Sequence, residues 1–399
     1  RQRQMCIRDS PGLPHDAIVF SSAATDETQT NWNGLLGYVR LRTEREVFFS
    51  AVRVYPKENT IDVQLVIDGS IPYKGILRVT SPALEKTEEK EIEISAGVHT
   101  IALEGLKLKE NVKKWDEEEG NLYDLTASLQ DGDEKSVTFG VRDFGDDGHG
   151  HLALNGRRIF LRSEANCCEF PETGHPPMTV GEWDKILRLY HSYGVNCMRF
   201  HSHIPPEAAF TAADQMGMLM QPELSHWNPK NAFEGDDSYE YYQRELKQTI
   251  LWLANHPSFV MLTFGNELWT GELGHQRMDA MVELAHSLDT TRMYANGSNP
   301  HYGTIGCDAK SDFYTSQKYY EYDLRGTFAA MPGDDGIQGY INNQYPSAAV
   351  NYDDSMKHLR ETYQKPVFSF EVGQFEILPD FGELEEFHGI SDPANLRII

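Results

Sequence analysis

The chain of 399 residues predicts a fold in two main parts, a β-sandwich followed by an α/β barrel. Two patterns predict it. Short alternating runs separated by turn signals fill residues 51–142, whereas after Gly140 strand-like runs alternate with helix-like runs. The length points the same way, because a chain of this size exceeds what one hydrophobic core normally organises.

The first part has the spacing of an immunoglobulin-like sandwich. Val63, Leu65 and Ile67 alternate with polar residues before the turn signal Asp68-Gly69. About seven short strands over roughly ninety residues are typical of this sandwich. The charged run 85–91 is expected to be a solvated loop or to guard an edge strand. The other candidate strands are 52–54, 76–79, 91–94, 99–103, 122–130 and 136–141.

The second part, residues 143–399, has the β-α alternation of a (β/α)8 barrel. The candidate strands are 158–162, 195–200, 218–222, 259–264, 292–295, 313–315 and 367–370. The candidate helices are 180–193, 206–216, 239–255, 275–288 and 357–362. A barrel of this type closes with an eighth strand, and no further buried run follows residue 371. We therefore expect an incomplete barrel with two unpaired strand edges, and an isolated chain that is nearly inactive.

Two of the candidate strands end in a glutamate. Glu267 follows the run 259–264, and Glu371 follows 367–370. The C-terminal strand ends of a barrel converge on one face, so these two side chains can meet although they are far apart in sequence. A pair of carboxylates suits the cleavage of a glycosidic bond, where one donates a proton and the other attacks the anomeric carbon.

Composition excludes some classes of partner. The net charge of −25 would repel a phosphate backbone, so nucleic acid is not an expected partner. No apolar run approaches the roughly 20 residues that cross a bilayer, so no membrane span is expected. Residues 1–10 have no apolar periodicity and read as non-native. Without a native N-terminus the localisation stays open, with bacterial periplasmic or secreted as the forced choice.

Several short motifs occur in an order that resembles glycoside hydrolase family 2, the family of β-galactosidases, β-glucuronidases and β-mannosidases. The resemblance covers nearly everything after residue 16. It implies the C-terminal strands of a sugar-binding jelly roll at 11–50, the sandwich at 51–142 and a catalytic barrel. It also implies a retaining mechanism, exo action on a carbohydrate substrate, and no cofactor. The motifs are Asn31-Trp32-Asn33-Gly34, Trp115 before Asn121-Leu122-Tyr123-Asp124-Leu125, Phe139-Gly140-Val141-Arg142, Leu154-Asn155-Gly156, Asn255-His256-Pro257-Ser258 and Asn266-Glu267.

The resemblance also implies roles for single residues. Glu267 matches the acid/base and Glu371 the nucleophile. Asn266 matches the residue that hydrogen-bonds the sugar 2-hydroxyl. Arg199 matches an arginine that holds the nucleophile ionised by charge pairing.

Other polar and aromatic residues stand at predicted strand ends, where sugars are commonly bound. Each is about as suited to supporting the site as to touching substrate, and Tyr314 on the weak sixth strand is a guess. The candidates are Glu164, Asn166, His201, His203, Glu223, Trp227, Trp269, Asn296 and Tyr314.

Two other classes of function remain open. His201-Ser202-His203 is a His-x-His at a strand end, as in metal-dependent barrel hydrolases, but only His301 offers a poor third ligand. No metal is therefore expected. A non-catalytic carbohydrate-binding protein on the same fold is the third class, and the presence of both Glu267 and Glu371 counts against it. The sequence determines neither the sugar, its linkage nor the oligomeric state. Acidic Glu164, Glu223 and Asp312 near the site disfavour an anionic sugar, although Arg162 and Arg199 could offset them.

Overall fold

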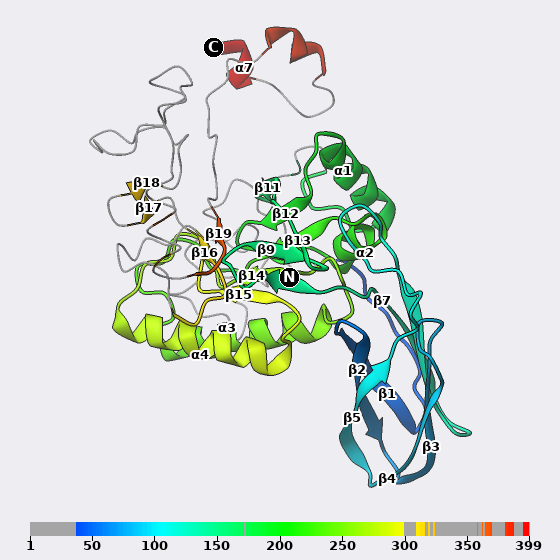
Figure 1. The fold of residues 1–399 in the computed structure, drawn as a ribbon. Helices are drawn as coiled ribbons and strands as arrows, with labels where there is room; N and C mark the ends of the chain where they lie inside the picture. The colour runs from blue at the N-terminus through cyan, green and yellow to red at the C-terminus, as the bar shows by residue number, and fades with distance from the viewer. Residues whose placement is uncertain are drawn as a thin grey trace, which may run out of the picture.

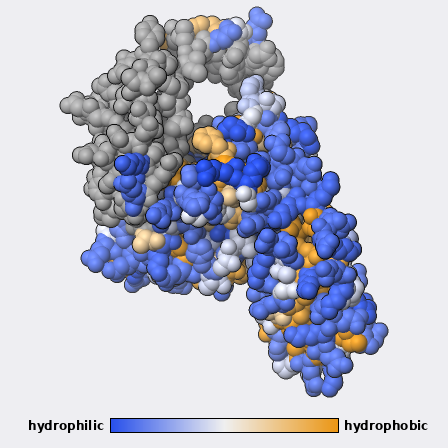
Figure 2. Space-filling view, in the orientation of Figure 1, coloured by the Kyte–Doolittle hydropathy of each residue, from blue (hydrophilic) through white to orange (hydrophobic). Residues whose placement is uncertain are grey.

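The computed structural model shows a sandwich joined to the underside of a barrel (Figure 1). The sandwich, coloured blue to cyan, extends away from the barrel, whose helices α3 and α4 lie along one side and α1 and α2 along another. The described surface is mainly hydrophilic, with hydrophobic residues visible along the sandwich (Figure 2). The structure describes residues 37–168, 170, 173–298, 309–315, 318–319, 322–323, 357, 361, 364–368, 380–386 and 394–398.

The sandwich consists of two antiparallel sheets, ordered β1-β2-β5 and β4-β3-β6-β7. Alternate residues of each strand point inward, because side chains of a strand project to opposite faces. In β2 this gives Ile61, Val63, Leu65 and Ile67, all fully buried. The strands are β1 (Val47–Pro56), β2 (Thr60–Gly69), β3 (Tyr73–Thr80), β4 (Glu88–Ile94), β5 (Gly97–Lys107), β6 (Tyr123–Leu129) and β7 (Glu134–Phe139).

Residues 88–91 of the charged run lie on β4, which is the edge strand of the four-stranded sheet. Glu89 pairs with Arg78 of β3, at 2.7 Å between carboxylate and guanidinium. An edge that carries exposed charges is a poor template for pairing with another chain.

A small antiparallel sheet closes the bottom of the barrel. It is ordered β10-β9-β8, from β8 (Phe144–Asp146), β9 (Leu152–Leu154) and β10 (Arg157–Arg158). Asn155 and Gly156 between β9 and β10 both have positive φ, 55° and 76°, which suits an Asn-Gly hairpin turn. Phe144, Leu152 and Leu154 pack with the lower residues of the barrel strands in one buried cluster.

The barrel strands run parallel in sequence order. Registers link β11 to β12 and β13, β14 to β15, and β16 to β19. Bridges at Met220–Phe259 and Glu223–Thr263 join β13 to β14, and the Asp312 amide donates to the Tyr294 carbonyl at 2.8 Å between β15 and β16. The strands are β11 (Ser163–Asn166), β12 (Cys197–Phe200), β13 (Leu219–Pro222), β14 (Met261–Thr263), β15 (Met293–Ala295), β16 (Tyr314–Thr315) and β19 (Val367–Phe368).

Helices cover the outside of these strands. Helix α1 begins with a capping box between Thr179 and Glu182, and α2 ends at Gly217, whose φ of 96° few other residues adopt. Their apolar faces pack on outward strand residues such as Met198, Phe200 and Leu262. The helices are α1 (Val180–Ser192), α2 (Glu207–Met216), α3 (Asp236–Trp252), α4 (Glu272–Leu288) and α7 (Ala394–Ile398), with η4 (Phe381–Glu386) and the hairpin β17 (Lys318–Tyr319) and β18 (Tyr322–Asp323).

The Asn255-His256-Pro257-Ser258 motif docks the sandwich to the barrel. The Asn255 side chain accepts from the Val54 amide and donates to the Val52 carbonyl, both at 2.9 Å, and so pairs with β1 as a short strand would. The His256 ring lies 2.6 Å from Asp214. A Cβ on Gly140 would meet Pro257 at 2.7 Å, so only glycine allows this contact.

Two sequence expectations are wrong in position. The first barrel strand is β11 at Ser163–Asn166, not 158–162, because Ile159 packs into the bottom cluster instead. Residues 37–46, the part of the expected jelly-roll segment 11–50 that precedes β1 and is described, form no strand, and the side chains of Val39 and Leu41 are exposed at 78% and 100%. Residues 1–36, with the first ten and the rest of that expected jelly roll, lie outside the described part.

Candidate functional site

A buried ion pair lies at the C-terminal ends of β12 and β13. The Nε of Arg199 donates to Oε1 of Glu223 at 2.7 Å, and Nη2 reaches Oε2 at 3.4 Å. The Ser202 amide donates to Oε2 at 2.9 Å, and the Ser298 hydroxyl donates to Oε1. Burial alone would raise the pKa of Glu223, but Arg199 and His201 offset it, and the pKa lies below its ordinary value. Glu223 is therefore ionised.

Arg199 also orients the side chain of Asn266. Nη2 donates to the Asn266 Oδ1 at 2.5 Å, so the amide nitrogen must point the other way. Asn266 is fully buried, and its Nδ2 has no hydrogen-bond partner among the described residues. A buried donor without a partner is costly, and such groups are rare. The Glu223–Arg199–Asn266 array thus holds one amide donor ready for a ligand.

Glu267 has an unusual backbone at the end of β14. Its φ is 50°, in the left-handed region that a non-glycine residue rarely adopts. Its amide donates to the Ser298 carbonyl at 2.9 Å, and its Oε2 lies 3.3 Å from the Trp227 indole nitrogen. Gly265 has φ 139°, and a Cβ there would meet the His226 carbonyl at 2.2 Å. Strain of this kind gathers at functional sites.

A buried polar cluster supports the segment that carries Trp227. The Glu245 carboxylate of α3 accepts from the Ser225 hydroxyl at 2.8 and 3.0 Å and from the Ser225 amide at 3.3 Å. Burial of this carboxyl group raises its pKa to about 7, and no cation lies within ion-pairing distance in the described part of the chain. The neighbouring His226 stacks on Tyr242 at 4.3 Å, and burial lowers its pKa to about 3, so this ring is neutral.

Neither histidine of the His-x-His belongs to a group of possible metal ligands in the described part of the chain. His201 packs edge-on against Trp227 at 4.8 Å and approaches the Ser202 hydroxyl at 3.1 Å. His203 is buried with its Nδ1 3.0 Å from the His201 carbonyl, and burial lowers its pKa to about 4. Among the described residues, no group of three or more His, Cys, Asp or Glu side chains could hold a metal ion.

Three acidic or amide candidates lie away from this array. Glu164 and Asn166 are register partners of Met198 and Phe200, which face the helices, so β11 places them on the outer side. Glu164 bonds with Tyr190 of α1, on the opposite face of the sheet from the Arg199 side chain. Asp312 accepts from the Tyr294 amide and contacts His286 of α4. Glu164 and Asp312 therefore do not disfavour an anionic sugar at this array, and Arg199 balances the charge of Glu223.

The remaining candidates lie in three places: beyond the end of a strand, within a strand, and outside the described residues. Trp269 is 40% exposed beyond the end of β14, and Tyr314 is buried within β16. Asn296 follows β15 and is only 2% exposed. Glu371 and His301 lie outside the described residues. The neighbouring β19 ends at Phe368 and pairs with β16, on the far side of β15 from β14.

Sequence reasoning missed two supporting residues. Ser298 donates to Glu223 and contacts the Thr263 hydroxyl at 2.9 Å, and so joins β13, β14 and the end of β15. Gln221 lies two residues before Glu223 on β13, fully buried, with an Nε2 that has no partner in the described part. The usable signal was position: both are polar residues in or just after a buried strand.

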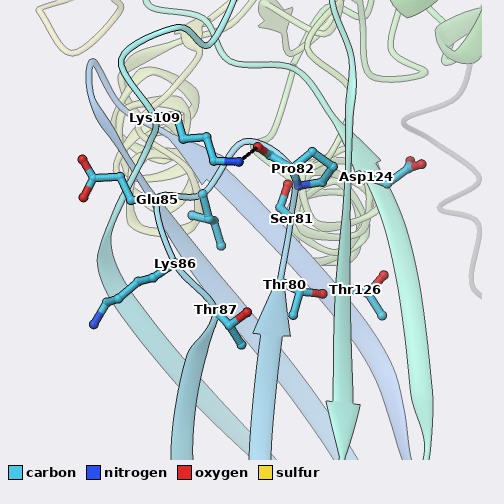
Figure 3. A pocket seen from close by; sticks show the side chains of 10 residues that line it. Thr80, Ser81, Pro82, Glu85, Lys86, Thr87, Lys109, Asp124 and Thr126 are labelled. Atoms are coloured by element: carbon cyan, nitrogen blue, oxygen red, sulfur yellow. Dashed lines mark hydrogen bonds between the residues drawn. The ribbon is translucent and has the colours of Figure 1, made fainter.

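A separate shallow hollow of about 380 Å³ lies on the sandwich (Figure 3). It is lined by strand and loop residues such as Thr80, Glu85 and Thr126, and Lys109 crosses it to donate to the Pro82 carbonyl at 2.8 Å. It lacks the strained backbone and the unpartnered buried donor of the barrel end.

No helix in the described ranges is long and apolar enough to span a membrane.

Curated relatives carry the names of glycosidases. A protein named putative beta-glucuronidase from Formosa agariphila is 29% identical over 201 residues, which are 47% of this chain and 18% of the relative. A beta-galactosidase from Vibrio vulnificus is 26% identical over 259 residues, 62% of this chain and 24% of the relative. The chain thus spans about a quarter or less of the length of these relatives.

Solved structures share the fold at low sequence identity. A GH2 beta-galacturonidase from Eisenbergiella tayi bound to galacturonate superposes with a TM-score of 0.67 at 18% identity, covering 84% of this chain and 58% of that one. A Bacteroides uniformis beta-glucuronidase gives a TM-score of 0.63 at 18% identity, covering 81% and 41%.

Family profiles match both parts of the chain. Residues 47–142 match the profile of glycosyl hydrolases family 2, and residues 149–389 match the TIM barrel domain of the same family. The second match alone covers more than half of the 399 residues. The seven sandwich strands and the parallel barrel strands agree with it. The chain belongs to glycosyl hydrolases family 2.

Proposed function

We propose that this chain carries the catalytic site of a retaining, exo-acting β-glycosidase. The observation that supports it most is the Glu223–Arg199–Asn266 array beside Glu267. A deep amide donor next to a strained, part-buried carboxylate suits a sugar whose 2-hydroxyl is held while its glycosidic oxygen is protonated.

In the proposed reaction Glu267 and Glu371 act in two displacements. The Glu371 carboxylate attacks the anomeric carbon while protonated Glu267 gives its proton to the leaving oxygen, and the bond to that oxygen breaks. A covalent glycosyl ester forms. Glu267, now a carboxylate, takes a proton from water, whose oxygen attacks the same carbon and releases Glu371.

Arg199 and Asn266 support this reaction by position. Asn266 Nδ2 would donate to the sugar 2-hydroxyl, a hydrogen bond that strengthens in the transition state. Because Glu223 balances the charge of Arg199, the array keeps its orientation without substrate. Arg199 would also stabilise the ionised form of Glu371, as the family resemblance implies.

The identity of the sugar is to be tested by a screen. Relatives are named for galactosides and glucuronides, so nitrophenyl β-galactoside and β-glucuronide are the first substrates to try, followed by mannoside and arabinoside. The complete gene product should be used. A screen in which no glycoside is hydrolysed contradicts the proposed function.

Geometry and rescue test the mechanism. A retaining pair requires the Glu267 and Glu371 carboxyl groups to lie roughly 5 to 5.5 Å apart, and a measured separation beyond about 8 Å excludes it. Glu371→Ala should abolish turnover. Added azide should restore turnover and give a glycosyl azide of inverted configuration, because azide attacks the anomeric carbon from the face that the lost carboxylate occupied. Product configuration is read by NMR.

A further inference from the structure

The ladder between β13 and β14 continues past both strand ends and builds a rigid rim. The Asn228 amide donates to the Asn266 carbonyl at 2.9 Å, and the Trp269 amide donates to the Pro229 carbonyl at 3.0 Å. The Ala232 amide then donates to the Trp269 carbonyl at 2.8 Å. Further on, the Glu234 carboxylate accepts from the Gly271 amide at 2.7 Å. The rim is thus fixed by main-chain bonds and resembles a sheet more than a free loop.

Leu268 on this rim is fully buried, whereas the alternate side chains become more exposed from Glu267 to Trp269. Asn266 is fully buried, Glu267 is part-buried, and Trp269 is 40% exposed. If Asn266 holds the sugar being transferred, and Glu267 protonates the oxygen that leaves, then the next residues outward lie beside the leaving group. An exposed indole held in place at this point is a suitable platform for a sugar ring.

Lys230 places a positive charge beside the Trp269 indole. Its Nζ lies 4.6 Å from the centre of the Trp269 ring, and its side chain is exposed. Among the described residues it has no acidic partner within ion-pairing distance. An ammonium group without a counter-charge attracts an anion that comes to rest on the neighbouring ring.

We propose that Trp269 and Lys230 form a leaving-group subsite that selects a sugar carrying a carboxylate or sulfate. This rests on the proposed glycosidase function and names the substrate class on the outer side of that same site. The indole stacks on the leaving-group ring, and Lys230 Nζ donates to its anionic substituent. The favoured substrates are then acidic oligosaccharides cut next to an anionic residue.

The test compares substrates that share the transferred sugar. These are a disaccharide with a uronic acid as leaving group, one with a sulfated leaving group, a neutral disaccharide, and the nitrophenyl glycoside. We expect the acidic disaccharides to exceed the neutral one in kcat/KM by roughly tenfold at low salt, and less at high salt. Whether carboxylate or sulfate is preferred follows from the two acidic substrates.

Variants separate charge from stacking. Lys230→Gln should reduce the acidic-to-neutral ratio to about one, and Lys230→Arg should retain most of it. Trp269→Ala should lower kcat/KM for all disaccharides relative to the nitrophenyl glycoside by roughly tenfold. Lys247→Gln, an exposed lysine on α3, is the matched control and should keep the wild-type ratio.

The outcomes are distinct. Hydrolysis of the nitrophenyl glycoside with no preference for acidic leaving groups, or an unchanged ratio in Lys230→Gln, overturns the subsite and leaves the glycosidase function standing. Failure to cleave any glycoside overturns the function and the subsite with it.

Discussion

Two buried arginine clusters occupy opposite ends of this barrel, and they use their donors differently. At the bottom, Arg142 donates to the carbonyls of Pro257, Thr291 and Phe259 at 2.7, 2.6 and 2.8 Å. Nearby Arg292 pairs with Asp289 and donates to three further carbonyls. Most of these donors are matched by main-chain carbonyls, although Arg292 Nε has no partner among the described residues, and the arrangement joins the sandwich to the barrel.

At the top, Arg199 donates to side chains instead, and the arrangement ends in an unpartnered amide nitrogen on Asn266. Backbone strain at Ser202 and Glu267, with φ of 55° and 50°, lies at this end. The bottom cluster is organised for stability, whereas the top holds groups in a costly state that a ligand would relieve. A buried arginine is therefore informative only once its acceptors are known.

Among the substitutions that change only the top end of the barrel, Glu267→Ala should lower kcat/KM the most. On a substrate with a poor leaving group we expect a loss of about 10²- to 10⁴-fold in kcat/KM, because protonation of the leaving oxygen is lost. A dinitrophenyl glycoside needs little protonation and should retain its first step. Equal losses on both substrates, with formation of the glycosyl-enzyme rate-limiting for each, would show that Glu267 is not the acid.

Two matched substitutions, Glu223→Gln at the top and Asp289→Asn at the bottom, test the comparison directly. Each leaves a buried arginine without its counter-charge, which costs on the order of 3–5 kcal/mol of stability. Both should therefore lower the denaturation midpoint. Only Glu223→Gln should also lower kcat per folded molecule, because it frees Arg199 from the orientation that Asn266 depends on. If Asp289→Asn lowers kcat as much, the two ends are not functionally distinct.

Glu245 extends the comparison to a buried carboxyl group with no cation within ion-pairing distance among the described residues. Its folded pKa of about 7 lies above the ordinary value of 4.5, so the folded state prefers the proton and stability falls as pH rises from about 4.5 to about 7. The loss is at most about 3 kcal/mol, from roughly 2.5 pKa units. Glu245→Gln cannot ionise and should lose this dependence. Urea denaturation at pH 5 and pH 8 measures it, and identical pH dependence in both proteins would contradict the assignment.

The sequence predicted the barrel better than the details of its site. Helices and the later strands were predictable because buried parallel strands are continuous apolar runs and the helices have a clear apolar face. The first strand was misplaced because Ile159 and Leu161 are apolar for a different reason, namely packing at the barrel bottom. That error also placed Glu164 at a strand end, whereas β11 includes it and turns it toward α1.

Within the site, strand ends indicated the candidates but not their partners. The expected pairing of Arg199 with Glu371 lies outside the described residues, and the sequence did not indicate that Arg199 also contacts Glu223 and Asn266. Periodicity shows which residues share a face of a strand, but it carries no information about which of several convergent side chains touch. Glu371, together with the expected spacing of the two carboxylates, remains a prediction.

The docking of Asn255 on β1 has a consequence for recombination of modules. The segment that grips the sandwich, 255–258, belongs by sequence to the barrel and leads directly into β14, whose far end carries Asn266 and Glu267. The natural unit of exchange is thus not the sandwich alone. In a chimera with a foreign sandwich in place of residues 47–142, the segment 255–258 would no longer match its partner, and β14, which presents the site, would shift. A successful graft should therefore transfer Asn255, His256, Pro257 and Arg142 together with the sandwich.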